Sequence, residues 1–180
     1  MNRTLIEQGV RLIIEGMGVE RDHNFADTPR RVADVYEELF SPHETKWPTF
    51  AEQFTDMVVM KGHVFYTLCP HHLLPVQLCA SIAYIPNGHV IGASKLMRMC
   101  HDTNRYPMTQ EALTSAIQRR IQTITEGTSK GEAVMLEGHH GCFNVRGVRS
   151  HSARMLTLKY GGIFNEQLEL RQRFEWMVRV

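Results

Sequence analysis

Thiols and imidazoles meet in two short segments of this sequence, CPHH at residues 69–72 and HHGC at residues 139–142. Each segment borders a strand-like apolar run. Zinc binds both ligand types readily, and a catalytic zinc site uses three protein ligands so that one position stays open for water. A single CxxH pair is often a coincidence of a core thiol and a surface imidazole, but two such clusters favour a catalytic metal centre. The ligands whose spacing can meet one ion are Cys69, His72 and Cys142.

Two histidines, His71 and His140, are left over from this ligand set. Imidazole titrates near neutral pH, so both side chains are suited to proton transfer beside an open metal position. The remaining cysteines, Cys79 and Cys100, are interpreted as small hydrophobic residues rather than ligands. The clusters therefore predict three metal ligands, an open position and two free histidines.

Basic residues gather in two places, SKLMR at residues 94–98 and RGVR at residues 146–149. Lys95 and Arg98 lie three positions apart at an expected strand-to-helix junction, where a helix N-terminus adds its own attraction for anions. These residues could hold phosphates, although a solvated surface is the ordinary alternative. The sequence has no GxxxxGK[ST] motif, so a phosphorylated ligand would be held here by its phosphates and react elsewhere.

Gln110 and Glu111 open the strongest helical pattern of the second half of the chain. A carboxylate in the first turn of a helix complements the helix dipole, which is one interpretation of Glu111. The same carboxylate could accept hydrogen bonds from the edge of a base. The residues alone leave both possibilities open.

Periodicity indicates the elements that must position these residues. Helical spacing of apolar residues occurs over residues 5–17, 28–40 and 111–124 and begins again after residue 95, and a polar helix is expected from about residue 166. Strands are predicted over residues 57–68, 76–85, 89–94, 132–138 and 153–160. Strands grouped around a pair of helices indicate an α+β fold with an antiparallel sheet rather than a doubly wound one.

Length and composition bound the organisation of the chain. With 180 residues, 43% hydrophobic and 22% charged, we expect a single domain, 1–180, with a helical part over about 1–50 and a catalytic part over about 55–180. The net charge of +1 gives no electrostatic case for nucleic acid or a membrane surface. No run of about 18 apolar residues and no signal-peptide layout is found, so we expect a cytoplasmic protein. Four cysteines fit a reduced compartment without disulfides.

Seven segments, in this order, resemble GTP cyclohydrolase I: DTPRRVADVYEELF, CPHHLLP, AYIPNGHVIGASKL, TQEALTSAI, HHGC, RGVRS and GGIF. Together they span about residues 27–164 and coincide with the family motifs in order and spacing. The resemblance implies the tunnelling fold (T-fold), an antiparallel sheet with helices packed on one face. It also implies a toroidal homo-oligomer, a homodecamer in this family, with active sites between subunits and a Zn²⁺ cofactor.

Members of this family open the imidazole ring of GTP, release C8 as formate, rearrange the ribose and close a new ring to give 7,8-dihydroneopterin triphosphate. The product would serve folate, pterin or deazaguanine biosynthesis. The resemblance implies that zinc lowers the pKa of a bound water to about 7 for attack on C8. It implies proton transfer by His140 to the ring nitrogen and by His71 near the ribose. The implied substrate-binding residues are Gln110 and Glu111 at the guanine edge, Ser94 near the ribose, and Lys95, Arg98 and Arg146 at the triphosphate.

The sequence departs from the family pattern in three places. Pro70 replaces the glutamate that usually stands between the cysteine and the histidine pair, which removes a carboxylate and a backbone N–H beside the metal ligands. The arginine-rich segment RRxQVQERLT becomes NRYPMTQEALT, and SHSARMLTLKY replaces the usual threonine-rich run after RGVR. These differences keep an altered substrate preference or altered regulation open.

Three other hypotheses remain at this point. One is an enzyme of the same fold that acts on another guanine nucleotide or stops at the ring-opened formamide. A second is an enzyme of the pyruvoyl-tetrahydropterin synthase or nitrile reductase kind; the Cys/His/Cys ligand set and the lack of a clearly placed nucleophilic cysteine argue against it. A third is a catalytically silent zinc module that binds pterins or nucleotides, which has little need for two free histidines beside an open metal position.

Overall fold

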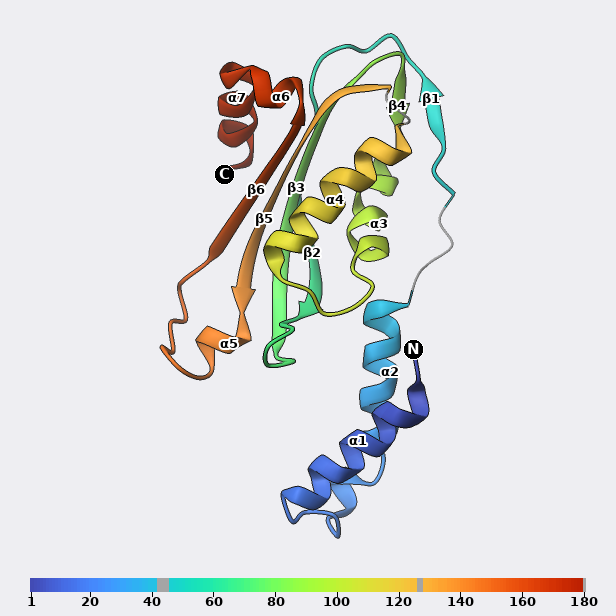
Figure 1. Ribbon diagram of the computed structural model, residues 1–180, viewed down its shortest axis with the longest axis vertical. Helices are drawn as coiled ribbons and strands as arrows, with labels where there is room; N and C mark the ends of the chain where they lie inside the picture. The colour runs from blue at the N-terminus through green and yellow to red at the C-terminus, as the bar shows by residue number, and fades with distance from the viewer. Residues whose placement is uncertain (42–45, 126–127, 180) are drawn as a thin grey trace. The chain divides into compact units, whose positions relative to one another are not determined.

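A computed structural model describes residues 1–41, 46–125 and 128–179 and divides the chain into two compact units, Met1–His43 and Glu44–Val180. The first unit is helical, with α1 (Arg3–Gly16), the 3-10 turn η1 (His23–Phe25) and α2 (Thr28–Phe40) (Figure 1). Arg3 joins the two helices, because its guanidinium donates to Asp34 and, at 2.8 Å, to Glu37. Both helices predicted for this region are confirmed.

The second unit is built on a four-stranded antiparallel sheet with the strand order β2-β3-β5-β6. Its strands are β2 (Val58–Leu68), β3 (Pro75–Pro86), β5 (Ser129–His140) and β6 (Met155–Gly162). A separate two-stranded sheet pairs β1 (Thr49–Ala51) with β4 (His89–Ile91). The predicted strands and their antiparallel pairing are confirmed, except that the strand predicted over residues 89–94 ends at Ile91 and a helix begins at Ala93. The strand β1 was not predicted, because its three exposed residues carry no periodic signal.

Two long helices cover one face of the four-stranded sheet, α3 (Ala93–Thr103) and α4 (Gln110–Ile124) (Figure 1). Side chains alternate between the faces of a strand, so Leu78 and Ile82 of β3 point to this side, where they share a fully buried cluster with Ile117 of α4. The predicted α+β class is confirmed. Within residues 1–41, 46–125 and 128–179, no helix combines the length and apolar character that a transmembrane span requires.

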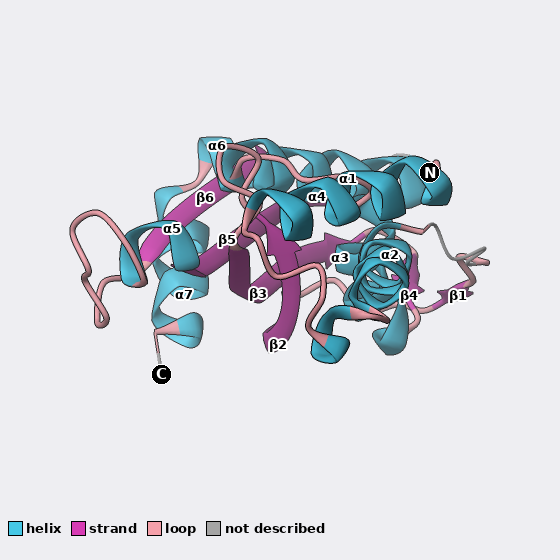
Figure 2. Ribbon diagram, turned by 90° about the horizontal axis from the view of Figure 1, so that it is seen from below, coloured by secondary structure: helices cyan, strands magenta, loops and turns pink. Residues whose placement is uncertain are grey.

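The opposite face carries a second, smaller cluster beneath α6 (Ile163–Glu166) and α7 (Leu168–Val178). Here Ala83 and Met135 contact Phe164 and Phe174, so the residues of β3 that point away from α4 are also buried at this end. Figure 2 shows α4 and α7 on opposite sides of the sheet. Helices on one face were predicted, and α7 adds partial cover to the other.

The register of the sheet brings the two cysteine–histidine clusters to the same end. Leu68 at the end of β2 lies opposite Pro75 at the start of β3, and Val76 lies opposite His140 at the end of β5. The turn after β2 and the short helix α5 (Gly141–Asn144) after β5 therefore meet, although about 70 residues of chain separate them.

Glu132 is a buried carboxyl between the sheet and α4, and we expect it to make stability depend on pH. Its side chain is 2% exposed and accepts a hydrogen bond from Gln118 Nε2 at 3.3 Å. Burial raises the pKa of Glu132 above its ordinary value, and the hydrogen bond from Gln118 offsets only part of this increase. Because the folded-state pKa is the higher one, the unfolded chain releases this proton first, and stability falls as pH rises through the folded pKa.

Glu132→Gln removes this titration and keeps an acceptor for Gln118. Thermal unfolding of the variant should therefore lose less stability than the unchanged protein between pH 5 and pH 8. Glu169→Gln, at an exposed position of α7, is the matched control and should follow the unchanged protein. Parallel melting temperatures for Glu132→Gln and the unchanged protein over this range would contradict the prediction.

Candidate active site

A tight turn carries the first two metal-ligating candidates. Cys69 N–H donates to Leu74 O at 2.9 Å, and Cys69 O accepts from Leu73 N–H at 2.8 Å and from His72 N–H at 3.4 Å. Leu73 has a φ of 52°, in the left-handed region that such a reversal needs. Pro70 stands at the second position of the turn, where its fixed φ is favoured. The backbone alone thus directs Cys69 and His72 to one side.

Cys142 reaches the same place from α5. Gly141 allows this approach, because a Cβ at this position would lie 2.9 Å from Pro75 O. The ligand atoms of Cys69, His72 and Cys142 all lie within 4.8 Å of one another, which is close enough to share one ion. Two thiols and one imidazole form a donor set that suits zinc.

The thiols of this group would have to lose their protons to bind a metal ion. Burial raises the pKa of the Cys142 thiol, and the neighbouring Cys69 raises it further. A cation would stabilise both thiolates together, because metal binding and thiol deprotonation are coupled. Of the other cysteines, Cys100 is fully buried and burial raises its pKa to about 12, as expected for a core thiol.

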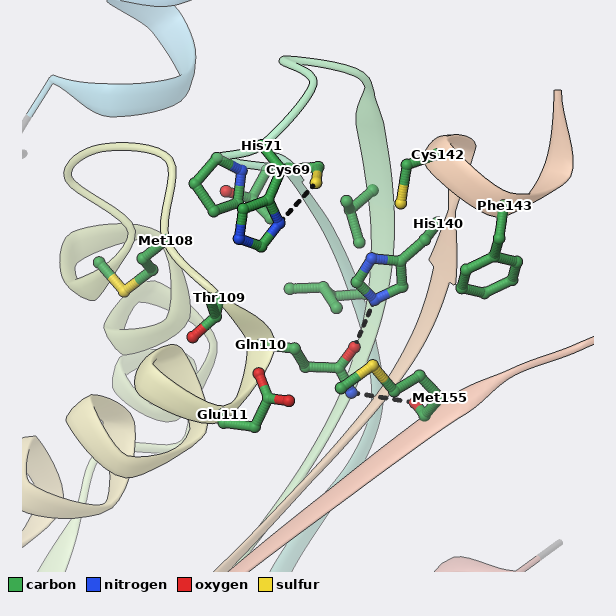
Figure 3. Close-up of a pocket in the computed structure, with 14 residues that line it drawn as sticks. Cys69, His71, Met108, Thr109, Gln110, Glu111, His140, Cys142, Phe143 and Met155 are labelled. Atoms are coloured by element: carbon green, nitrogen blue, oxygen red, sulfur yellow. Dashed lines mark hydrogen bonds between the residues drawn. The ribbon is translucent and has the colours of Figure 1, made fainter. Parts of the chain in front are cut away.

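A pocket of about 280 Å³ opens beside Cys69 and Cys142, both of which line it (Figure 3). Predicted site residues line it, among them His71, Glu111 and His140. Glu111 comes from the first turn of α4, whose N-cap Thr109 accepts a hydrogen bond from Ala112 N–H. The cavity therefore brings a metal-ligating group, two further histidines and a carboxylate together, as predicted.

His140 lies at the end of β5 and is held on two sides. Its Nε2 lies 2.7 Å from Gln110 Oε1, and its ring stacks on Phe143 with centroids 5.4 Å apart. Burial lowers the pKa of His140; Glu111 partly offsets this, and His139 adds to the decrease. The imidazole is therefore biased towards its neutral form at neutral pH, in which it can accept a proton.

Arg146 joins the site from the loop after α5. Its Nη1 donates to Nε2 of His72 at 3.0 Å, and its side chain is otherwise exposed. The guanidinium thus lies at the rim of the metal-ligating group, where an anionic part of a ligand could reach it.

The structure does not bring Ser94, Lys95 and Arg98 to this pocket. All three lie in the first half of α3, which begins just after β4. Ile91 of β4 donates to Tyr84 Oη at 2.8 Å, and Tyr84 lies eight positions along β3 from Val76, a rise of roughly 26 Å. Within one chain, Ser94, Lys95 and Arg98 therefore lie towards the opposite end of the sheet from the three candidate metal ligands, whereas Arg146 lies beside them.

Several pocket residues were not predicted. Phe143 directly follows Cys142, so its position beside the cluster was a usable signal. Met108 and Met155 also line the pocket, but nothing local to either residue indicates this. An apolar wall of this kind depends on how α4 and β6 pack, which sequence spacing does not report.

Comparisons with known proteins find a family model and named relatives that match nearly the whole chain. The family model described as GTP cyclohydrolase I matches residues 6–179. A protein of Clostridium perfringens named GTP cyclohydrolase 1 is 37% identical over 179 residues, covering 95% of each chain. Another of this name, from Sulfurihydrogenibium sp., is 38% identical over 177 residues, covering 97% of this chain and 94% of its own. The solved archaeosine synthase QueF-Like in the apo form covers 62% of this chain and 96% of its own, at 14% identity and a TM-score of 0.46.

Proposed function

Because the chain belongs to the GTP cyclohydrolase I family, we propose that it hydrolyses GTP at C8, releases formate and closes a new ring to give 7,8-dihydroneopterin triphosphate. The proposal rests on one observation above all: Cys69, His72 and Cys142 converge beside a pocket that also holds His140 and Glu111. A binding-only module has no need for this combination of metal ligands and proton-transfer groups.

The chain's own residues divide the work within the pocket. The metal ion that Cys69, His72 and Cys142 would hold, which we propose to be zinc, supplies a Lewis acid that activates water for attack on C8. Glu111 faces the pocket and can accept two hydrogen bonds from adjacent N–H groups of the guanine edge, as a carboxylate does in bidentate pairing. His140 first takes up a proton, on the nitrogen that faces the substrate, and then delivers it to the imidazole-ring nitrogen of the substrate as the bond to C8 breaks.

His71 serves a later step. Its Nδ1 lies 3.7 Å from the sulfur of Cys69, and it lines the pocket without belonging to the metal-ligating group. An imidazole in this position can exchange protons with the ribose part of the substrate during the rearrangement. Apolar walls around these groups limit water access and strengthen their electrostatic interactions.

The complete substrate site is proposed to need a second copy of the chain. A pocket of about 280 Å³ is at the small end for a ligand site, which suits a base better than a whole nucleoside triphosphate. Ser94, Lys95 and Arg98 are suited to the ribose and the phosphates, but they lie at the far end of the sheet. A neighbouring subunit of a ring-shaped homo-oligomer, which we propose to be a decamer, would bring its own α3 to this pocket.

One assay tests the reaction. We expect the purified, zinc-loaded protein to release formate from GTP and to form a product that becomes fluorescent on oxidation, as a pterin does. Formate without the fluorescent product would mean that turnover stops at the ring-opened stage. Turnover of another guanine nucleotide in place of GTP would revise the substrate, and no formate from any guanine nucleotide would contradict the proposal.

A further inference from the structure

Gln110 was predicted to bind the guanine edge, but its contacts indicate a different role. We propose that Gln110 is a positioning residue, which holds His140 in the tautomer with the proton on Nε2 and so leaves Nδ1 as the nitrogen that exchanges a proton with the substrate. This inference builds on the proposed function, because it assigns the reacting atom of His140.

The orientation of the Gln110 amide is fixed by the backbone of the sheet. Its Nε2 lies 2.9 Å from Leu136 O and 2.9 Å from Met155 O, with Thr157 Oγ1 at 3.1 Å. Carbonyl oxygens only accept hydrogen bonds, so the amide nitrogen must face them. A flipped amide would place its oxygen against two carbonyl oxygens, which cannot donate a hydrogen bond to it.

This orientation determines where the proton of His140 resides. With the amide nitrogen turned to the sheet, the amide oxygen of Gln110 faces His140, and Oε1 lies 2.7 Å from Nε2. An amide oxygen can only accept a hydrogen bond. Nε2 must therefore carry the hydrogen, and in the neutral ring Nδ1 then holds the lone pair. Within residues 1–41, 46–125 and 128–179, no hydrogen bond to Nδ1 is formed, so this nitrogen remains available to a ligand.

The contact is held rigidly and is isolated from solvent. Gln110 is 4% exposed, and Figure 3 shows its amide between His140 and Met155. Gly138 leaves room for it, because a Cβ there would overlap the Gln110 amide oxygen and lie 2.7 Å from His140 Nε2. Phe143 fixes the plane of the imidazole ring. Since both N–H groups of Gln110 are shared among three protein acceptors, none is left for a base.

The test compares Gln110→Met with Gln118→Met. Both glutamines are buried residues of α4 that face the sheet, at 4% and 6% exposure, but Gln118 bonds to Glu132, away from the pocket. The first readout is ¹⁵N NMR of histidine-labelled, zinc-loaded protein at pH 8, with the His140 signals identified by their loss in His140→Ala. We expect an Nε2–H tautomer in the unchanged protein and in Gln118→Met, and a mixture of tautomers in Gln110→Met.

Steady-state kinetics with GTP give the second readout. For Gln110→Met, kcat should fall by about ten- to a hundredfold with KM nearly unchanged, because a partner that orients a catalytic group is lost rather than a substrate contact. Gln118→Met should keep kcat within a few-fold. A Gln110→Met variant that raises KM alone would overturn the proposal in favour of direct substrate binding.

The ¹⁵N spectrum of the unchanged protein tests the proposed tautomer of His140 even if Gln110→Met does not fold. An Nδ1–H tautomer of His140 would overturn the proposal outright. The NMR readout needs no turnover, so a protein that is inactive with GTP but keeps the Nε2–H tautomer would refute the proposed function and leave the role of Gln110 standing.

Discussion

Cys142→Ala is expected to lose both the bound metal and turnover of GTP, whereas His140→Ala should keep the metal and lose turnover. The alanine at position 142 leaves two of three ligands, and a zinc site with two protein ligands binds weakly. At position 140 the ligand set is intact, but the proton donor for ring opening is gone. General acid–base catalysis contributes about 10² to 10⁴ in rate, so kcat should fall by that order.

Elemental mass spectrometry after desalting measures the metal content of each variant. Together with the formate-release assay, it distinguishes the two variants. Cys79→Ala is the matched control, because Cys79 is a half-buried thiol of β3 that does not line the pocket. It should retain both metal and turnover. A fully active Cys142→Ala protein would refute the ligand assignment, and loss of metal from His140→Ala would refute the division of roles.

Mixed oligomers of two inactive variants should regain activity if the site is shared between subunits. Lys95→Ala removes the proposed phosphate-binding group from one end of the sheet, and His140→Ala removes the proposed proton donor at the other. Each homogeneous protein should be close to inactive. In a random equal mixture, half of the pockets keep His140 and half of those meet an intact Lys95, so about a quarter of the original activity should return.

Coexpression with two different affinity tags yields the mixed assemblies, and the product assay with GTP measures their activity. A mixture of Lys95→Ala with Arg98→Ala is the matched control. These two residues belong to the same helix and are contributed together by one subunit, so no mixed site is complete and activity should stay low. Verified mixed assemblies of Lys95→Ala and His140→Ala without recovered turnover would contradict a shared site.

Much of this architecture could be predicted because its signals are local. The strands on either side of the PNG turn at residues 86–88 and the helix that opens at Gln110 follow from periodicity and turn residues. That Cys69, His72 and Cys142 come together was predictable because thiols and imidazoles in two clusters have few other common uses. The strand order β2-β3-β5-β6 could not be predicted in this way, since it depends on pairings between segments far apart in sequence.

The positioning role that we propose for Gln110 could not be inferred from the sequence, for the same physical reason. A glutamine beside a glutamate at the start of a helix suggests a polar pair that acts together, but Gln110 is buried and Glu111 is exposed, although both line the pocket. The partners of Gln110 are two carbonyl oxygens on different strands and an imidazole 30 positions away, and none of these can be inferred from spacing. Likewise, the separation between Lys95 and the pocket depends on the length and direction of β3, which spacing in the sequence does not give.

Pro70, the departure beside the metal ligands, has a consequence for how the ion is exchanged. The turn in which it stands is closed by its own backbone hydrogen bonds, between Cys69 and residues 72–74. A proline that fits its native φ also restricts the unfolded chain, which typically stabilises a protein by about 0.4–1 kcal/mol. We therefore expect a chelator to remove a bound metal ion without unfolding the protein, in contrast to zinc fingers. Occupancy of the site would then be reversible.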